Sequence, residues 1–145
     1  MGRTPEASSP DALARMRRQR RRDTAPELAL RSLLHRRGRR FRVDFPLPTL
    51  RRRADIVFPR ERVAVFVDGC FWHGCPAHAT QPKQNREWWE AKIVQNRLRD
   101  TDTDRRLEAL GWTSVRVWEH ENPGAAADRI DVILRRARSR ETGAR

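Results

Sequence analysis

The chain has 145 residues, enough for one domain with one hydrophobic core, and no apolar run approaches the roughly 20 residues that span a bilayer. Lysine and arginine total 32 against 19 acidic residues, a formal net charge of +13 that is almost entirely guanidinium, because Lys83 and Lys92 are the two lysines. Such a balance favours a polyanionic partner, most simply nucleic acid; the alternative is a solvated surface that is rich in arginine.

The amino-terminal segment predicts a basic arm. Residues 1–12 are rich in Ser, Pro and small side chains, which is typical of disorder, and residues 15–22 (RMRRQRRR) form a run that orders on an anion. The segment lacks the apolar centre of a signal peptide, so we expect a cytoplasmic, nucleoid-associated protein whose thiols stay reduced. We predict a flexible arm over 1–22, one domain over 23–138 and a flexible tail over 139–145.

Residues 23–38 are predicted to form a helix. Thr24 and Glu27 have the spacing of a capping box, Pro26 suits the first turn, and Gly38 is a good stop. Three leucines make its apolar face: Leu30, Leu33 and Leu34.

Three short strands are predicted next. Residues 41–47 (FRVDFPL) alternate like a half-buried strand. Residues 54–59 and 63–69 are short, β-branched apolar runs separated by a charged connection, which is typical of a hairpin through the core.

A long helix is predicted over 84–110, followed by a strand over 113–119 and a helix over 125–138. In the long helix, five residues share one face at helical spacing: Trp89, Lys92, Ile93, Asn96 and Asp100. Trp and Ile turn that face inward, where the polar members indicate a site. In the last helix three residues face inward: Ile130, Ile133 and Leu134. The element order predicts an α/β domain, one sheet flanked by helices.

Residues 68–81 (DGCFWHGCPAHATQ) contain both cysteines of the chain and two of its four histidines. Structural zinc takes four Cys or His ligands in a tetrahedron, and this loop supplies three: Cys70, Cys75 and His78. His120, after the strand over 113–119, is the best candidate for the fourth ligand, because strand ends cluster in a sheet. His35 is a weaker one. The alternative is two buried free cysteines and surface histidines.

Four segments together resemble the very short patch repair (Vsr) endonucleases, the DNA mismatch endonuclease family: RRRADIVF, GCFWHGCPAH, NREWWEAKIVQNRLRD and LGWTSVRVWEHE. The resemblance runs from about Met16 to Glu121. It implies a fold related to type II restriction endonucleases, a central mixed sheet flanked by helices with a structural Zn²⁺ site. It also implies Mg²⁺-dependent nicking of one strand beside the T of a T:G mismatch left by deamination of 5-methylcytosine.

The resemblance also implies catalytic roles. Asp55 matches the aspartate that holds Mg²⁺, and the carbonyl of Val67 can serve the same metal; the alternative for Asp55 is a strand-end cap. His73 matches the general base, with a zinc ligand or a surface histidine as the alternative. Asp100 matches the acid that orients this histidine, or is an exposed helix aspartate. Glu27 matches a glutamate near the metal's water shell, but a capping box explains it equally well.

Aromatic residues are implied to enter the DNA. Phe71, Trp72 and Trp89 match the side chains that push into the base stack at the mismatch, where unstacking costs least. The alternative is that Trp88 or Trp89 packs the core. Met16 matches a methionine that approaches from the minor groove while the arginines around it clamp phosphates.

Some features depart from related nucleases. Many of them carry an acid and a lysine on the strand after the first aspartate, where this chain reads Val65-Phe66-Val67. Asp68 stands where many relatives have a second histidine, so it is either a metal ligand or a local charge. Two other functions stay open: a zinc-stabilised DNA-binding module without catalysis, and a restriction-type nuclease that cuts normal duplex. We expect a monomer that acts on double-stranded DNA, with mismatch-repair proteins as candidate partners.

Overall fold

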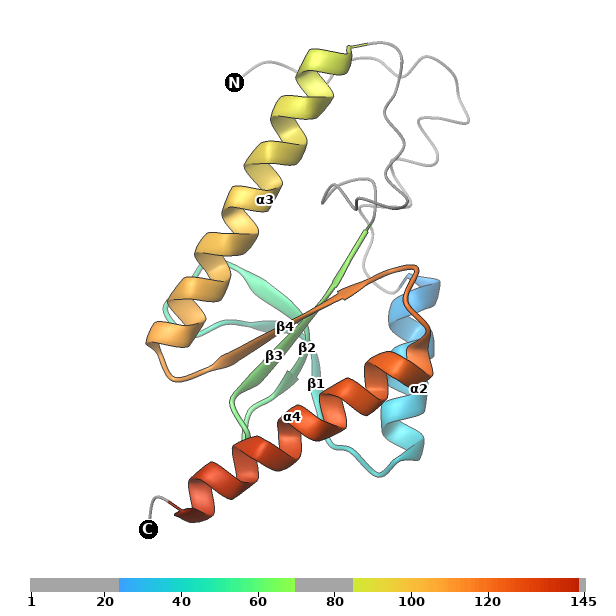
Figure 1. Cartoon of the computed structure of the whole chain (residues 1–145), viewed down its shortest axis with the longest axis vertical. Helices are drawn as coiled ribbons and strands as arrows, with labels where there is room; N and C mark the ends of the chain where they lie inside the picture. Colours follow the sequence, from blue (N-terminus) through green and yellow to red (C-terminus); the bar gives the residue numbers. More distant parts are fainter. Residues whose placement is uncertain (1–23, 70–84, 144–145) are drawn as a thin grey trace.

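The computed structural model describes residues 24–69 and 85–143. Within these residues three helices and four strands follow one another (Figure 1): α2 Ala25–Arg36, β1 Arg42–Pro46, β2 Arg53–Phe58, β3 Val63–Asp68, α3 Arg86–Ala109, β4 Thr113–Trp118 and α4 Pro123–Gly143. Each predicted helix and strand is present, with ends that differ by a few residues. The largest difference is α4, which continues past the predicted end at Arg138 to Gly143.

The four strands form one mixed sheet in the order β1-β2-β3-β4. The β1–β2 and β2–β3 pairs are antiparallel, which confirms the predicted hairpin. The β3–β4 pair is parallel, with Val63 opposite Thr113 and Asp68 opposite Trp118. A parallel pair needs a long crossover, and α3 lies in that connection. The predicted α/β class with a central mixed sheet is therefore confirmed.

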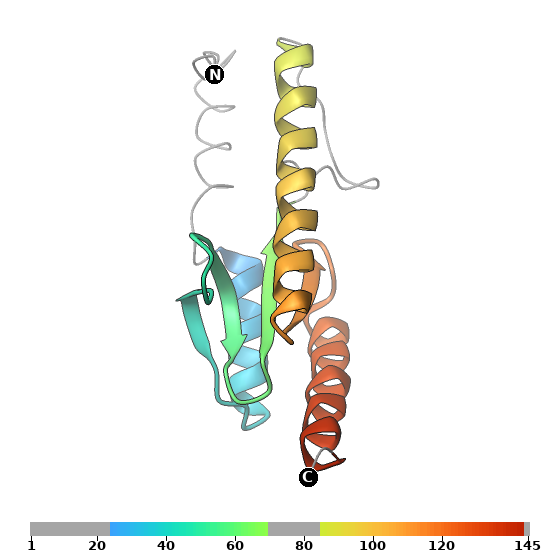
Figure 2. The same cartoon turned by 90° about the vertical axis from the view of Figure 1, so that its left-hand side faces the viewer.

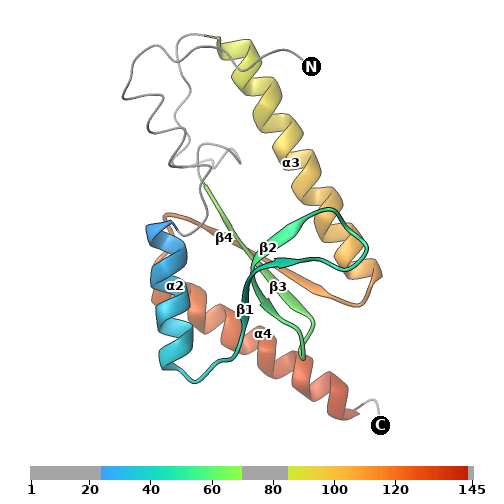
Figure 3. The same ribbon diagram turned by 180° about the vertical axis from the view of Figure 1, so that it is seen from behind.

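Helices cover both faces of the sheet. Leu30 and Leu34 of α2 and Ile130 and Leu134 of α4 share one apolar cluster with β2, β3 and β4, and the two helices pack against each other (Figure 3). Leu107 of α3 belongs to a second cluster, which includes residues of β2 and β3. The amino-terminal half of α3 extends past the end of the sheet (Figure 2). No helix within 24–69 and 85–143 is both long enough and apolar enough to cross a bilayer.

Glycines end two of the helices, as predicted for the first. Gly38 has φ +78° and its amide donates to the His35 carbonyl at 3.0 Å, while Gly111 has φ +81° and donates to the Glu108 carbonyl at 3.0 Å. Only glycine adopts this left-handed conformation without strain from a Cβ, so it suits the residue just past a helix.

The start of α2 differs from its prediction. Pro26 lies in the first turn as expected, but the Thr24 side chain makes no capping hydrogen bond, so the predicted capping box is wrong. The reason lies one turn further on, where the Glu27 carboxylate accepts a hydrogen bond from Arg31 at 3.0 Å. Glu27 is only 5% exposed. The acid therefore serves an inward-facing ion pair rather than the helix end.

The polar stripe of α3 is confirmed. Trp89 and Leu107 are buried at its two ends, and the predicted polar members are half-buried between them: Lys92, Asn96 and Asp100. Val94 and Leu98, on other faces of the helix, are 54% and 66% exposed. This helix therefore turns polar groups inward and some apolar groups outward, the reverse of a simple amphipathic helix.

Candidate active site

Asp55 lies on β2 and is tied to the neighbouring strand. Its Oδ2 accepts a hydrogen bond from the backbone amide of Val67 on β3 at 2.7 Å. Burial, together with the nearby carboxylates of Glu27 and Asp68, raises the pKa of Asp55 to about 7, against the opposing effects of the Val67 amide and Arg31. Such a strongly shifted carboxyl group is typical of a functional site.

The three acids come from different elements. Glu27 is on the first turn of α2, Asp55 on β2 and Asp68 at the carboxyl end of β3, and Glu27 and Asp68 are 5% and 7% exposed. We call these three residues the acid cluster. The carboxylates of Glu27 and Asp68 repel negative charge on Asp55, so a proton or a cation is favoured at Asp55.

Arg116 on β4 links the acid cluster to α3. Its guanidinium lies 3.1 Å from Asp68, 3.4 Å from Asp100 and 3.0 Å from Asp104, measured between nitrogen and carboxylate oxygen. It also sits over the ring of Phe66, 4.0 Å from the centroid. Burial lowers the pKa of Arg116, but the three carboxylates outweigh this effect and raise it. One cation therefore fixes three acids from two elements.

Arg116 is the residue that sequence reasoning missed. Asp100 was expected beside His73, and within the described residues the structure places it in an ion pair with Arg116. A signal was present in the sequence: Arg116 interrupts two buried valines, Val115 and Val117, in a strand that pairs with the interior strand β3. A charged residue at that position implies a buried partner of opposite charge.

Much of the predicted zinc and DNA-contacting loop lies outside the described residues: Cys70, Phe71, Trp72, His73, Cys75 and His78, together with Met16 of the arm. His120 is described, and its imidazole stacks on Trp118 with 6.5 Å between ring centroids. The β3–β4 register pairs Asp68 with Trp118, two residues before Cys70 and His120 respectively. Within the described ranges, no three Cys, His, Asp or Glu side chains stand close enough to hold a metal.

Trp89 was predicted either to enter DNA or to pack the core. It is 4% exposed and meets the ring of Trp88 edge-on, with 4.7 Å between centroids. Burial confirms that one of the two tryptophans packs inside, and the role of Trp89 in DNA stays a prediction.

The chain is similar to known endonucleases over most of its length. The family model described as DNA mismatch endonuclease Vsr matches residues 10–79. A type II nicking enzyme of Lentzea aerocolonigenes, V.NaeI, is 44% identical over 122 residues, which cover 81% of this chain and 74% of that protein. V.XorIIP, a type II nicking enzyme of Xanthomonas oryzae, is 43% identical over 82% of this chain and 88% of its own length. The DNA mismatch endonuclease Vsr of Escherichia coli is 42% identical over 68% of this chain and 62% of its own length. These relations show that the chain belongs to the Vsr family of DNA endonucleases.

Proposed function

We propose that this endonuclease uses Mg²⁺ to nick one strand of double-stranded DNA beside the T of a T:G mismatch. The observation that carries the proposal is Asp55, a carboxyl group with its pKa raised to about 7 beside Glu27 and Asp68. The family model is described as a mismatch endonuclease, and relatives are named as nicking enzymes. The general family activity supports cleavage of DNA, and these names favour a nick at a mismatch.

The oxygen donors around Asp55 suit a hard cation. Mg²⁺ prefers carboxylate and carbonyl oxygens, and the Asp55 carboxylate with the Val67 carbonyl would hold it, with Glu27 near its water shell. Repulsion of an ionised Asp55 by the nearby carboxylates of Glu27 and Asp68 supports this fit, because a dication would relieve it. When bound, the metal supplies electrostatic stabilisation of charge on the scissile phosphate. The hydrogen bond from Val67 to Asp55 fixes the orientation of the carboxylate.

The remaining chemistry falls to His73 and Asp100. In hydrolysis the oxygen of water bonds to phosphorus, the bond from phosphorus to the 3′ oxygen breaks, and the products are a 5′-phosphate and a 3′-hydroxyl. We infer that His73 takes the proton of that water and that Asp100 orients the imidazole. The Arg116 ion pair restricts where the Asp100 carboxylate can point.

The loop between β3 and α3 completes the proposal. Cys70, Cys75, His78 and His120 would bind structural Zn²⁺. The parallel β3–β4 register supports this set, because Asp68 and Trp118, each two residues before Cys70 or His120 in the sequence, lie opposite one another. Phe71, Trp72 and Trp89 would then separate bases at the mismatch, and Met16 would approach from the minor groove. A monomer, with mismatch-repair proteins as partners, stays a prediction.

A nicking assay on labelled duplexes tests this function. We expect the wild-type protein to cut one strand of a T:G duplex when Mg²⁺ is present and neither strand when it is absent. The matched T:A duplex should stay intact. Asp55→Ala and His73→Ala should each lower the nicking rate by at least about 100-fold, as general acid–base and metal roles imply. Glu108→Ala, which removes an exposed acid on α3, is the matched control and should cut at the wild-type rate.

The outcomes separate the alternatives. Equal cutting of T:G and T:A duplexes would favour a restriction-type nuclease that acts on normal DNA. If Asp55→Ala nicks DNA at the wild-type rate, the proposed role of the acid cluster in catalysis is wrong.

A further inference from the structure

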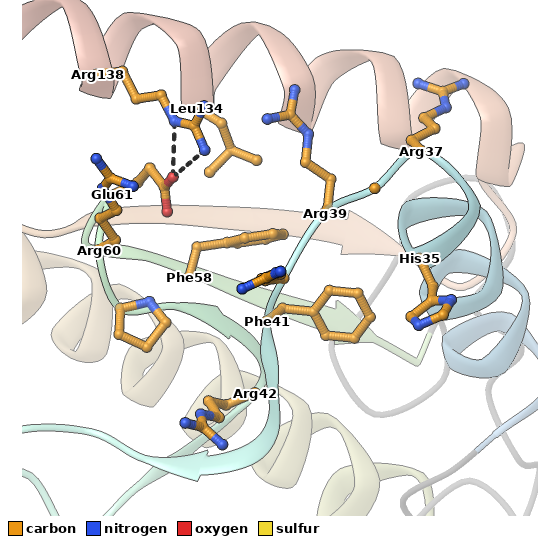
Figure 4. A pocket seen from close by; sticks show the side chains of 13 residues that line it. His35, Arg37, Arg39, Phe41, Arg42, Phe58, Arg60, Glu61, Leu134 and Arg138 are labelled. Carbon is orange, nitrogen blue, oxygen red and sulfur yellow. Dashed lines mark hydrogen bonds and ion pairs between the residues drawn. The ribbon is translucent and has the colours of Figure 1, made fainter.

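A second charged site lies at the other end of the sheet. A hollow of about 940 Å³ opens between the end of α2, β1, the β2–β3 turn and α4 (Figure 4). Six arginines line it: Arg37, Arg39, Arg40, Arg42, Arg60 and Arg138. We call this site the basic hollow. Glu61 is the one acid in its lining.

Half of these arginines are engaged by neighbouring acids. Arg37 and Arg39 both bind Asp131 of α4, at 2.7 and 2.8 Å, and Arg138 binds Glu61 at 3.0 Å, the pair joined by dashed lines in Figure 4. These pairs fix the walls of the hollow.

The other three arginines carry charge that the described residues do not neutralise. Arg40, Arg42 and Arg60 are exposed, and none of them forms an ion pair or side-chain hydrogen bond within 24–69 and 85–143. They come from the approach to β1, from β1 itself and from the β2–β3 turn, so separate segments aim positive charge at one concave surface. Guanidinium groups in such an arrangement match phosphate in both charge and hydrogen-bond geometry.

The floor of the hollow argues against an apolar protein ligand. Phe58 and Leu134 are at most 1% exposed, and Phe41 packs edge-on against Phe58 with 5.9 Å between centroids. The large apolar side chains that are exposed in the described part of the chain do not line the hollow: Leu28, Val43, Val94, Leu98, Leu110 and Val132. A ligand therefore meets the arginines beside the half-buried Phe41 and the exposed Pro59, and the larger apolar side chains of the floor are out of its reach.

The basic hollow is separate from the acid cluster. Its lining includes Phe58 to Glu61, directly before β3, whereas Asp68 ends that strand. A six-residue strand spans roughly 17 Å at about 3.3 Å per residue. The basic hollow and the acid cluster therefore lie at opposite ends of the same strand.

We propose that the basic hollow binds the phosphate backbone of a second DNA segment, so that one molecule holds two stretches of duplex. The ligand class is phosphodiester, read by charge and without base contacts. The family's action on DNA makes the same polymer the nearest source of phosphate. The inference rests on the endonuclease family and does not depend on mismatch preference or on Mg²⁺.

A bridging assay tests the proposal. A fully paired duplex is fixed to beads, loaded with protein in chelator at low salt, and offered a second, fluorescent duplex. Retained protein and captured duplex are measured separately, so loss of the first contact is distinguished from loss of the second. The chelator and the absence of a mismatch make the result independent of the proposed nicking reaction.

The variants compare equal losses of charge. The triple variant Arg40→Ala, Arg42→Ala, Arg60→Ala should capture about 10-fold less second duplex, because three phosphate contacts are lost, while it stays on the beads. The control triple variant Arg105→Ala, Arg135→Ala, Arg136→Ala removes three exposed arginines that do not line the hollow, and should capture duplex like the wild type. Arg60→Ala alone should show a partial loss, which keeps the test decisive should the triple variant fold poorly.

Three results would overturn the proposal: no capture by the wild type, equal losses in both triple variants, or undiminished capture by the hollow variants. The last result would leave an acidic protein segment as the ligand that fits the charge.

Discussion

Asp55 opposes the stability of the fold, and Asp55→Asn tests this idea. Asparagine has nearly the same shape, and its Oδ1 can still accept the hydrogen bond from Val67. Asparagine carries no charge, so it avoids the free-energy cost of burying a charge and the repulsion from Glu27 and Asp68. These two effects raise the pKa of Asp55 from 3.8 to about 7.

The sign of the effect follows from which state holds the proton. Below pH 3.8 the carboxyl group is neutral in the folded and unfolded chains, so Asp55 has little effect. As the pH rises, the unfolded chain loses the proton first while the folded protein retains it until about pH 7. Stability is therefore lost across this window, by about 4 kcal/mol at most, at about 1.4 kcal/mol per pKa unit. Water at the partly exposed carboxylate screens the charge, and we expect about 2 to 4 kcal/mol.

Urea denaturation in chelator at pH 5 and pH 8.5 measures the effect. The Asp55→Asn protein should be the more stable one at pH 8.5, and its advantage over the wild type should grow by about 1 to 3 kcal/mol between the two values. Taking the difference between the two proteins removes the contribution of histidines, which both share. Glu108→Gln, an exposed acid on α3, is the control and should show no such growth. An advantage that is the same at both pH values would refute the assigned environment of Asp55.

Three further substitutions test the packing around the site. Arg116→Met should lower the free energy of unfolding by about 2 to 4 kcal/mol, because three carboxylates lose their common cation. Urea denaturation measures this loss, and an unchanged midpoint would show that water already solvates the three carboxylates. Leu107→Ala should cost about 2 to 5 kcal/mol, since this fully buried leucine anchors α3 to the sheet, and a smaller loss would mean that the cluster collapses into the gap. Gly111→Ala should lower thermal stability by about 1 kcal/mol from its positive φ, although the nearest atom to a new Cβ, at 3.6 Å, leaves room; equal melting temperatures would contradict the strain.

Local patterns predicted the elements because each pattern has a short-range cause. The inward stripe of α3 repeats at helical spacing, and Gly38 stops α2 through its own backbone freedom. The end of α4 was placed too early, because residues 139–142 (SRET) contain no stop before Gly143. Helix-forming residues can extend a helix that tertiary packing has already started.

The features that the sequence did not reveal depend on burial and on contacts between residues far apart in the chain. Thr24 and Glu27 have capping-box spacing, yet Glu27 turns to Arg31, because burial favours the ion pair. Arg116 gathers three acids only because β4 lies parallel to β3 and under α3, and the sequence contains no direct record of that register. Of the candidate site, Glu27, Asp55, Asp68 and Asp100 were named individually from the sequence, whereas Arg116 and Asp104 were not.

The parallel pairing of β3 with β4 has a further consequence. A hairpin would have fixed the link between these strands at a few residues, whereas a crossover sets no such limit on length. The segment between Asp68 and Thr113 can therefore gain or lose residues while the sheet register stays the same. Evolution can therefore lengthen or shorten this excursion of the chain while Glu27, Asp55 and Asp68 keep their places on α2, β2 and β3.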